Sequence, residues 1–280
     1  MSEEQLIAEA ILQLKQESNV IKDYIFPIAM ALFSSLIGAV IGYRVYLRQE
    51  KLTAEKRKLD ILNKWILIAD EMHQSLLATK YNYYGNLTSN PYQRFLVVPS
   101  IIGMGKNYQL EYHELVFITD QKETKWLNVA YLRTLFANYN TLRSMWNIRN
   151  ELNDKVRIQF FKANNLNTAY ADLSDEEIES KINQSDLSCL IDLTERSLRL
   201  TDDLIIEFYK FLNEFPTAVS KKIDLKLLKN YGFILHLDFK KNKAVHLLLE
   251  ECPLPDYKKI SKITGKTEEE LMARYSPLFK

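Results

Sequence analysis

The sequence predicts a mainly α-helical fold, in which a single N-terminal transmembrane helix continues into a cytoplasmic helical bundle and a small α+β subdomain follows at the C-terminus. Three observations support this prediction. One uncharged block near the N-terminus has the length of a membrane span. Apolar residues recur at helical spacing over long later segments. Finally, the 280 residues include only 7 glycines and 7 prolines, which favours long helices over glycine-rich loops.

The uncharged block is the strongest single feature of the sequence. Asp23 and Arg44 bracket 20 uncharged residues, YIFPIAMALFSSLIGAVIGY, and about 20 residues of helix cross a hydrocarbon core about 30 Å thick. Tyr24 and Tyr43 lie at its two ends, as in the aromatic belts of membrane interfaces. The length argues against a buried helix of a soluble core, and the acidic segment before the block argues against a cleavable signal peptide. We therefore predict a transmembrane helix at residues 24–47.

The charges on either side of the block predict its orientation. Residues 1–23 carry more acidic than basic side chains, whereas the other flank is strongly basic. The positive-inside rule then places the short N-terminal tail outside the cell and the residues after the span in the cytoplasm, with the span in the inner (plasma) membrane. The basic residues expected to contact lipid headgroups are Arg44, Arg48, Lys51, Lys56, Arg57 and Lys58.

Small side chains recur along one stripe of the predicted span. Ser34, Gly38 and Gly42 lie at successive positions four residues apart, and this spacing lets two helix backbones approach closely in a membrane. Many single spans contain the pattern without using it. The stripe predicts packing between copies of the chain, so we expect a homo-oligomer.

The span is expected to continue as a juxtamembrane helix over residues 48–84, because no helix breaker interrupts this segment. Residues 85–121 follow as a loop and strand insertion, in which the β-branched and aromatic runs RFLVVPS and QLEYHELVFITD predict short strands. Heptad spacing of the juxtamembrane helix predicts a packing seam of the coiled-coil type. The seam residues are Leu52, Leu59, Leu62, Ile66, Ala69, His73 and Leu76.

A helical bundle is predicted for residues 122–216. One amphipathic helix is expected over about 123–162, and a second from Ser174 to Pro216, because apolar residues recur at helical spacing along both. Ser174 and Glu177 have the spacing of a capping box, which marks the start of the second helix. Antiparallel packing of these helices onto the juxtamembrane helix would form the bundle.

The pattern changes at residues 217–280, where the sequence predicts the α+β subdomain. Asp224 can cap a short helix that ends at Gly232, and the apolar runs FILHLDF and AVHLLLEE flank the basic turn KKNK as in a β-hairpin. Two short helices, KISKITG and TEEELMARY, complete the prediction. Thr267 and Glu270 have the spacing of another capping box.

Three residues of this C-terminal region are candidates for catalysis: Asp224, Asp238 and Lys240. In a metal-dependent nuclease or hydrolase, carboxylates hold Mg²⁺ and a lysine can orient the attacking water. Charged turns after apolar runs produce the same residues by chance, so solvated turn residues are the ordinary alternative. The sequence predicts no cofactor site and no metal site from ligand spacing, and it favours a protein without enzymatic activity.

Lysines also concentrate in this region, and they could contact the phosphates of a lipid or of a nucleic acid. A solvated face is the ordinary alternative. The net charge of +1 lacks the strong basic field of a general nucleic-acid binder, so nucleic acid is not an expected partner. The lysines are Lys221, Lys222, Lys226, Lys229, Lys240, Lys241 and Lys243.

Together these patterns predict a single-pass membrane-anchored protein that forms oligomers. Its cytoplasmic helical domain is expected to sense a state or bind a cytoplasmic protein partner. By analogy of architecture it could be a membrane-acting effector, for example in bacterial antiviral defence. The alternative is a membrane-tethered, metal-dependent hydrolase or nuclease that uses the C-terminal subdomain.

Overall fold

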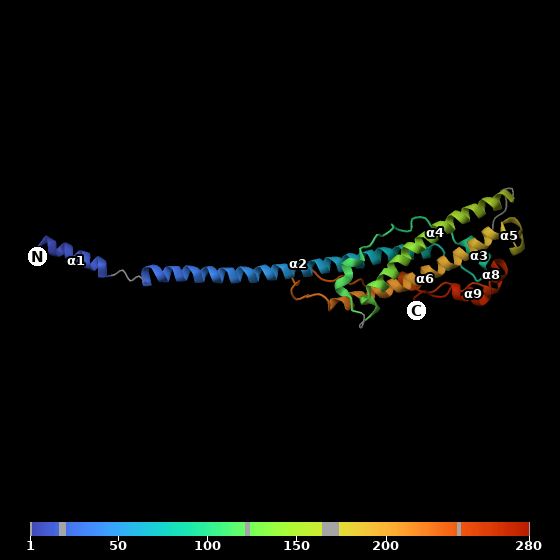
Figure 1. The fold of residues 1–280 in the computed structure, drawn as a ribbon. Helices are drawn as coiled ribbons and strands as arrows, with labels where there is room; N and C mark the ends of the chain where they lie inside the picture. Colours follow the sequence, from blue (N-terminus) through green and yellow to red (C-terminus); the bar gives the residue numbers. More distant parts are fainter. Residues whose placement is uncertain (1, 17–20, 121–123, 164–173, 240–241, 280) are drawn as a thin grey trace. The chain divides into compact units, whose positions relative to one another are not determined.

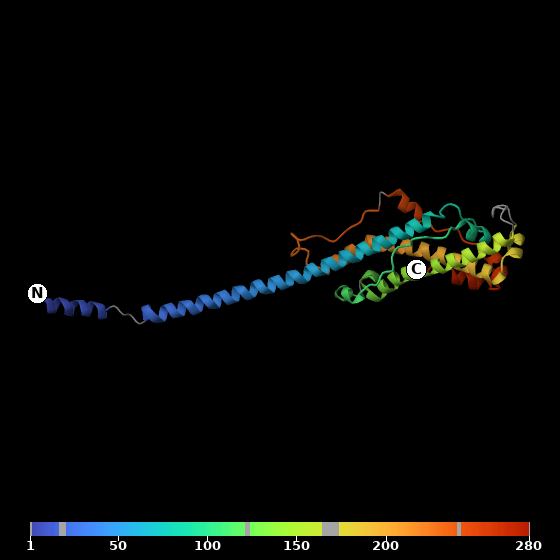
Figure 2. The ribbon, with the colours of Figure 1, turned by 90° about the horizontal axis from the view of Figure 1, so that it is seen from above.

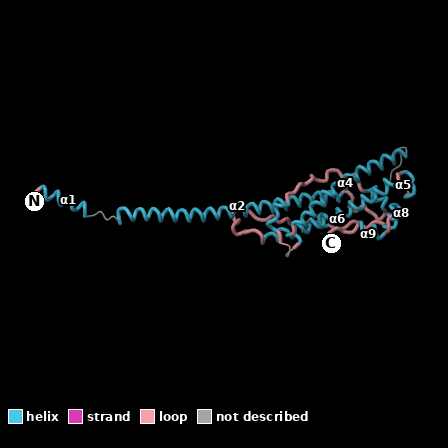
Figure 3. Tube along the Cα trace, viewed as in Figure 1, coloured by secondary structure: helices cyan, strands magenta, loops and turns pink. Residues whose placement is uncertain are grey.

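The structure of the chain, a computed structural model, divides into two compact units, residues 1–57 and 58–280. Helices dominate the described residues, and no strand occurs among them (Figures 1 and 3). The mainly α-helical prediction is confirmed, and the predicted α+β subdomain is wrong. The described residues are 2–16, 21–120, 124–163, 174–239 and 242–279.

The first unit contains α1 (Glu3–Gln16), a π-helical turn η1 (Ile21–Ile25) and the beginning of α2 (Phe26–Tyr81). Pro27 lies in the first turn of α2, where its missing N–H costs least. The most apolar 18-residue window of this helix has a mean hydropathy of 2.2, and none of it is buried inside the protein. Within the described residues, this helix is long and apolar enough to cross a membrane.

The second unit begins where α2 acquires a buried face. The heptad seam that the sequence predicts is buried from Leu59 to Leu76, and His73 is fully buried within it. Helices of the same chain cover this seam: the ring of Trp65 meets that of Phe136 edge-on with centroids 5.0 Å apart. This part of the seam therefore packs inside the unit and does not form a coiled coil between copies.

Two long helices, α4 (Val129–Ala163) and α6 (Gln184–Ser220), lie beside the second half of α2 (Figures 1 and 2). Phe136 of α4 packs edge-on against Phe208 of α6, with ring centroids 5.4 Å apart. Aromatic side chains in edge-on contact thus form the centre of the three-helix core. Long helices were expected in both of these regions, because apolar residues repeat over many turns there.

The first bundle helix starts later than predicted. A short 3₁₀ turn η3 (Lys125–Leu127) precedes α4, and the side-chain oxygen of Thr124 accepts a hydrogen bond from the Trp126 N–H. The Asn128 side-chain oxygen then accepts bonds from the N–H groups of Ala130 and Tyr131 and so starts α4. The predicted boundary at residues 121 and 122 lies outside the described residues.

The second predicted helix is two helices. The capping box at Ser174 is confirmed and starts α5 (Asp175–Lys181), but Asn183 then caps a new helix, α6, through bonds from the N–H groups of Ser185 and Asp186. Helix α6 also continues past Pro216, which the sequence predicted as its end. Burial of Pro216 and its neighbours in the core outweighs the loss of one backbone hydrogen bond.

The two strands predicted near residues 94 and 112 are wrong. The first is helix α3 (Pro91–Val97), which starts because Asn90 accepts a bond from the Tyr92 N–H and Pro91 occupies the first helical position. The second is a 3₁₀ helix, η2 (Tyr112–Ile118). Local capping at Asn90 prevails over the β propensity of the following valines.

The predicted hairpin after Gly232 is also wrong. Its first arm has no strand partner among the described residues, since the side chain of Asn63 on α2 bonds to Phe233 O at 3.0 Å and to Leu235 N at 2.9 Å. Its second arm is helix α7 (Lys243–Leu248). Residues 225–231 form turns in place of the short helix expected after Asp224.

The two predicted terminal helices are confirmed as α8 (Tyr257–Thr264) and α9 (Glu268–Arg274). Gly265 ends α8 in the left-handed conformation with φ 71°, and Thr267 starts α9 through the predicted capping box. Both helices bury apolar side chains in a second core cluster with α3, α5 and α6. This packing fixes the C-terminal segment beside α6.

Candidate functional site

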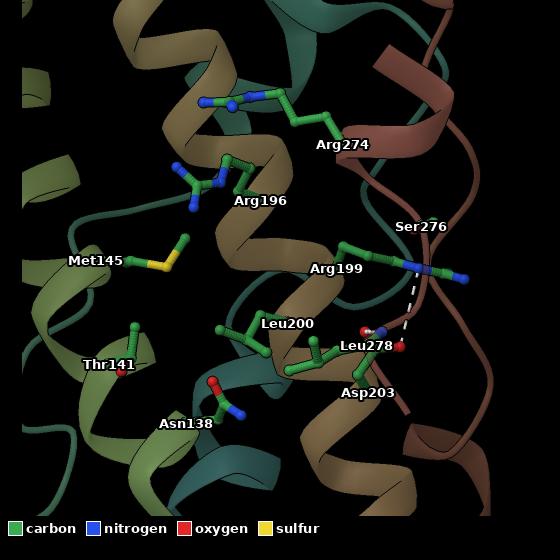
Figure 4. Close-up of a pocket in the computed structure, with 10 residues that line it drawn as sticks. All are labelled: Asn138, Thr141, Met145, Arg196, Arg199, Leu200, Asp203, Arg274, Ser276 and Leu278. Carbon is green, nitrogen blue, oxygen red and sulfur yellow. Dashed lines mark hydrogen bonds and ion pairs between the residues drawn. The ribbon is translucent and has the colours of Figure 1, made fainter. Parts of the chain in front are cut away.

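A cavity of about 220 Å³ lies between α4, α6 and the C-terminal segment that includes α9, entirely within the second unit (Figure 4). We call it the arginine pocket. Its wall combines apolar side chains, neutral polar groups and charges, as is typical of a small-molecule site. The lining residues are Asn138, Thr141, Met145, Arg196, Arg199, Leu200, Asp203, Arg274, Ser276 and Leu278.

Two of the three arginines in this wall are already paired. Arg274 donates hydrogen bonds of 2.5 Å and 2.6 Å to the two carboxylate oxygens of Asp192. Arg199 bonds to Glu251 at 2.5 Å and lies 3.9 Å from a carboxylate oxygen of Asp203. Its Nε is buried and makes no hydrogen bond to a described residue. These pairs hold the two side chains in place at the pocket wall.

Arg196 differs from the other two arginines. Its side chain is half-buried, and within the described part of the chain it makes no hydrogen bond or ion pair. In Figure 4 the guanidinium groups of Arg196 and Arg274 point to the same side of α6, toward Met145, whereas that of Arg199 points the other way. Arg196 is therefore placed to form charge-assisted hydrogen bonds with an anion that enters the pocket.

Asp203 makes the charge of the pocket depend on pH. Its Oδ2 accepts a hydrogen bond from the Leu278 N–H at 2.9 Å. Burial raises the pKa of Asp203 to about 6, although the Leu278 bond and Arg199 oppose this shift. As the pH falls through about 6, the carboxylate is protonated and the pocket becomes more positive. An anion should then bind more tightly.

A second, more open cavity of about 580 Å³ adjoins the first, because Arg196 and Arg274 line both. Lys266, Glu270 and Ala273 complete its wall. A ligand longer than the arginine pocket could therefore extend across the two arginines toward Lys266. The two cavities together offer more cationic than anionic side chains.

Two of the three catalytic candidates, Asp224 and Asp238, lie in the described part of the chain. Asp224 accepts a bond from the Leu227 N–H at 3.2 Å, as a turn residue does, and Asp238 is exposed. Lys240 lies outside the described residues. No group of three or more possible metal ligands occurs in the described part of the chain, and the hairpin on which the candidates depended is not formed there.

The predicted membrane residues all lie on α2. Ser34, Gly38 and Gly42 are exposed, and no other part of the chain comes within 4 Å of a Cβ built on either glycine. Arg44, Arg48, Lys51 and Arg57 are exposed, and Lys56 and Lys58 are half-buried. The stripe of small side chains is thus open to a second helix, and the basic side chains remain near the end of the apolar block.

Sequence reasoning missed the arginine pocket. Its charged residues lie on α6, where Arg196, Arg199 and Asp203 alternate with the apolar stripe, and Arg274 joins them only through the packing of α9. The sequence signal that could have indicated the pocket was the group of charged residues Arg196, Arg199 and Asp203 within a helix that has a long apolar face. Arg274 is too far along the sequence from the other three charged residues for a sequence pattern to group it with them.

No family model, curated protein or solved structure matches this chain.

Proposed function

We propose that the protein is a single-pass membrane protein whose cytoplasmic unit, residues 58–280, senses a small anionic ligand in the arginine pocket. The membrane part of the proposal is supported by an uncharged, strongly hydrophobic helix segment that is exposed and long enough to span a bilayer. The basic flank after this surface supports a cytoplasmic location for the unit and an N-terminus outside the inner (plasma) membrane.

The observation that carries the sensing role is the guanidinium of Arg196 in the pocket wall, which interacts electrostatically with Asp192 but makes no hydrogen bond to a described residue. Arginine binds phosphate and carboxylate groups through two parallel bonds, so the ligand should carry one of these groups. Met145, Leu200 and Leu278 would contact an apolar part of the same ligand. Among the described lining residues of this pocket, Asp203 is the one carboxylate.

A buried ion pair connects the pocket to the membrane helix. Asp202 lies on α6 next to the pocket residue Asp203, and it pairs with Lys80 of α2 at 2.7 Å, with both side chains 1% exposed. A ligand that moves α6 would therefore act on α2, the helix that continues into the apolar block. If copies also pack through Ser34, Gly38 and Gly42, the signal would reach a membrane oligomer. This is the arrangement expected of a membrane-acting effector, for example in bacterial antiviral defence.

The sensing role is tested by substitution of Arg196. In the full chain in nanodiscs, Arg196→Gln should weaken the binding of inorganic phosphate or a nucleoside monophosphate about tenfold, since a charge-assisted hydrogen bond contributes about 1.5–3 kcal/mol. Calorimetric titration measures the affinity. The control is Arg157→Gln, which changes an exposed arginine of α4 that does not line the pocket. Equal affinity in wild type and Arg196→Gln, or no binding to the wild type, would refute the proposed site.

A further inference from the structure

A patch of exposed apolar side chains lies on the second unit in a segment that the proposed function does not use. Leu225 is 41% exposed, Tyr231 45% and Phe233 72%. Large apolar side chains that gather in one short irregular segment indicate an interaction surface more strongly than scattered ones.

Lysines accompany these apolar residues. Lys221, Lys226 and Lys229 are exposed, while Lys222 is held by Asp120 at 2.9 Å. Residues 225–233, LKLLKNYGF, contain no acidic residue. The segment therefore offers aromatic and aliphatic side chains among exposed cations, which is the combination found in polypeptides that lie at a membrane surface.

Side-chain bonds fix the segment beside the first turns of α2 in this unit (Figures 1 and 2). Both carboxylate oxygens of Asp60 accept from the Tyr231 hydroxyl, at 3.0 Å and 2.9 Å. A Cβ on Gly232 would lie 3.5 Å from the side chain of Leu59. Asp60 follows the predicted end of the span at residue 47 by only 13 residues of sequence. A membrane anchor there would therefore tether the segment to the bilayer through a short length of chain.

We propose that residues 221–233 dock on the cytoplasmic surface of the membrane in which the chain is anchored. Phe233 and Leu225 enter the boundary between headgroups and acyl chains, and the lysines contact phosphates of anionic lipids. This inference rests on the proposed membrane anchor. Because the anchor keeps the segment close to the bilayer, even a weak surface affinity produces a high occupancy.

The charges and the attachment favour lipid over other partners. A protein groove that bound the apolar residues would not require three exposed lysines, and the anchor presents an anionic bilayer to them continuously. Docking at this position would also hold α2 and the turn segment together at the membrane surface. The segment would then limit the orientations that the cytoplasmic unit adopts.

The test uses the full chain in vesicles of phosphatidylcholine with or without phosphatidylserine. A fluorophore is attached at Asn230→Cys, which is exposed within the segment, in a Cys189→Ser background. The control position is Met272→Cys, which is exposed on α9. With phosphatidylserine present, lipids that carry a nitroxide quencher should quench the fluorophore at residue 230 several-fold more than the one at residue 272.

Two variants test the chemistry of docking. Replacement of Lys221, Lys226 and Lys229 by glutamine should lower the equilibrium constant for docking about fivefold for each lysine, and Phe233→Ser should lower it further. Equal quenching at the two labelled positions, or quenching that neither variant changes, would overturn the docking proposal. Alkaline carbonate extraction of the same vesicles separates the two proposals: a retained chain with equal quenching refutes docking alone, whereas a released chain refutes the anchor and docking together.

Discussion

His73 is the residue whose burial has the clearest thermodynamic consequence. Its side chain is fully buried, neither ring nitrogen bonds to a described residue, and the rings of Phe239 and Tyr209 lie 5.6 Å and 6.4 Å from it. Burial lowers the pKa of His73 to about 4. The heptad position predicted a residue at the packed seam, and the structure shows that it is enclosed by aromatic rings.

This lowered pKa predicts a specific acid sensitivity. The neutral ring stabilises the fold above its unfolded pKa of about 6.5, and about 3 kcal/mol is lost as the pH falls from there through about 4. His73→Leu should remove this loss and raise stability at neutral pH by about 1 kcal/mol, because it also removes the unpaired nitrogens. Urea unfolding followed by the fluorescence of Trp65, Trp126 and Trp146 reports on the second unit alone.

The exposed histidine His113 supplies the control for this experiment. His113→Leu replaces a ring that is 75% exposed and should therefore keep the acid sensitivity of the wild type. If His73→Leu kept the full loss of stability between pH 7 and pH 4, the acid sensitivity would have another origin.

At the scale of helices, one buried ion pair joins three parts of the second unit. Asp202 of α6 pairs with Lys80 of α2 and also accepts a bond from the Cys252 N–H at 2.6 Å. The Lys80 ammonium in turn donates to the backbone oxygen of Glu250. Desolvation of two charges is costly, so a pair of this kind is retained where its geometry specifies how helices meet.

Removal of one partner of this ion pair should therefore strongly lower the stability of the second unit. Lys80→Met should destabilise the second unit by about 3–5 kcal/mol, because Asp202 remains buried without its counter-ion. A second change, Asp202→Asn, should restore part of that loss, since asparagine still accepts the Cys252 bond without a buried charge. The control Lys155→Met breaks an exposed pair with Asp186 and should cost less than about 1 kcal/mol. Chemical unfolding monitored by tryptophan fluorescence measures all three; equal costs for Lys80→Met and Lys155→Met would contradict this account.

The open stripe on α2 makes a further prediction at this scale. Gly38→Leu with Gly42→Leu should weaken self-association of the full chain in detergent at least tenfold, because bulky side chains keep helix backbones apart. Analytical ultracentrifugation measures the association. Leu36→Ala with Val40→Ala, on another face of the same helix, is the control. Association that survives the glycine substitutions would mean that the stripe is not the interface.

Local signals explain which elements the sequence could predict. Ser174 and Thr267 cap helices through neighbours three residues away, so their patterns were readable. The predicted hairpin does not form because the side chain of Asn63, about 170 residues earlier, bonds to the backbone of Phe233 and Leu235. The arginine pocket likewise required the packing of separate helices. Contacts between residues that are far apart in the sequence produce no repeating pattern that a single sequence could reveal.

At the scale of the whole molecule, one membrane span is proposed to separate a short outer segment from a cytoplasmic sensing unit. The chain supplies two convenient reporters of this topology. Ser2 and Cys189 are exposed on opposite sides of the apolar block in the sequence. Cys252 should react slowly with maleimides, since burial raises the pKa of its thiol to about 12.

The most direct test is the labelling of spheroplasts by a maleimide that does not cross membranes. The chain with Ser2→Cys and Cys189→Ser should be labelled without detergent, whereas Cys189 of the native chain should be labelled only after detergent dissolves the membrane. Labelling of Cys189 in intact spheroplasts, or protection of residue 2 until detergent is added, would contradict the proposed topology.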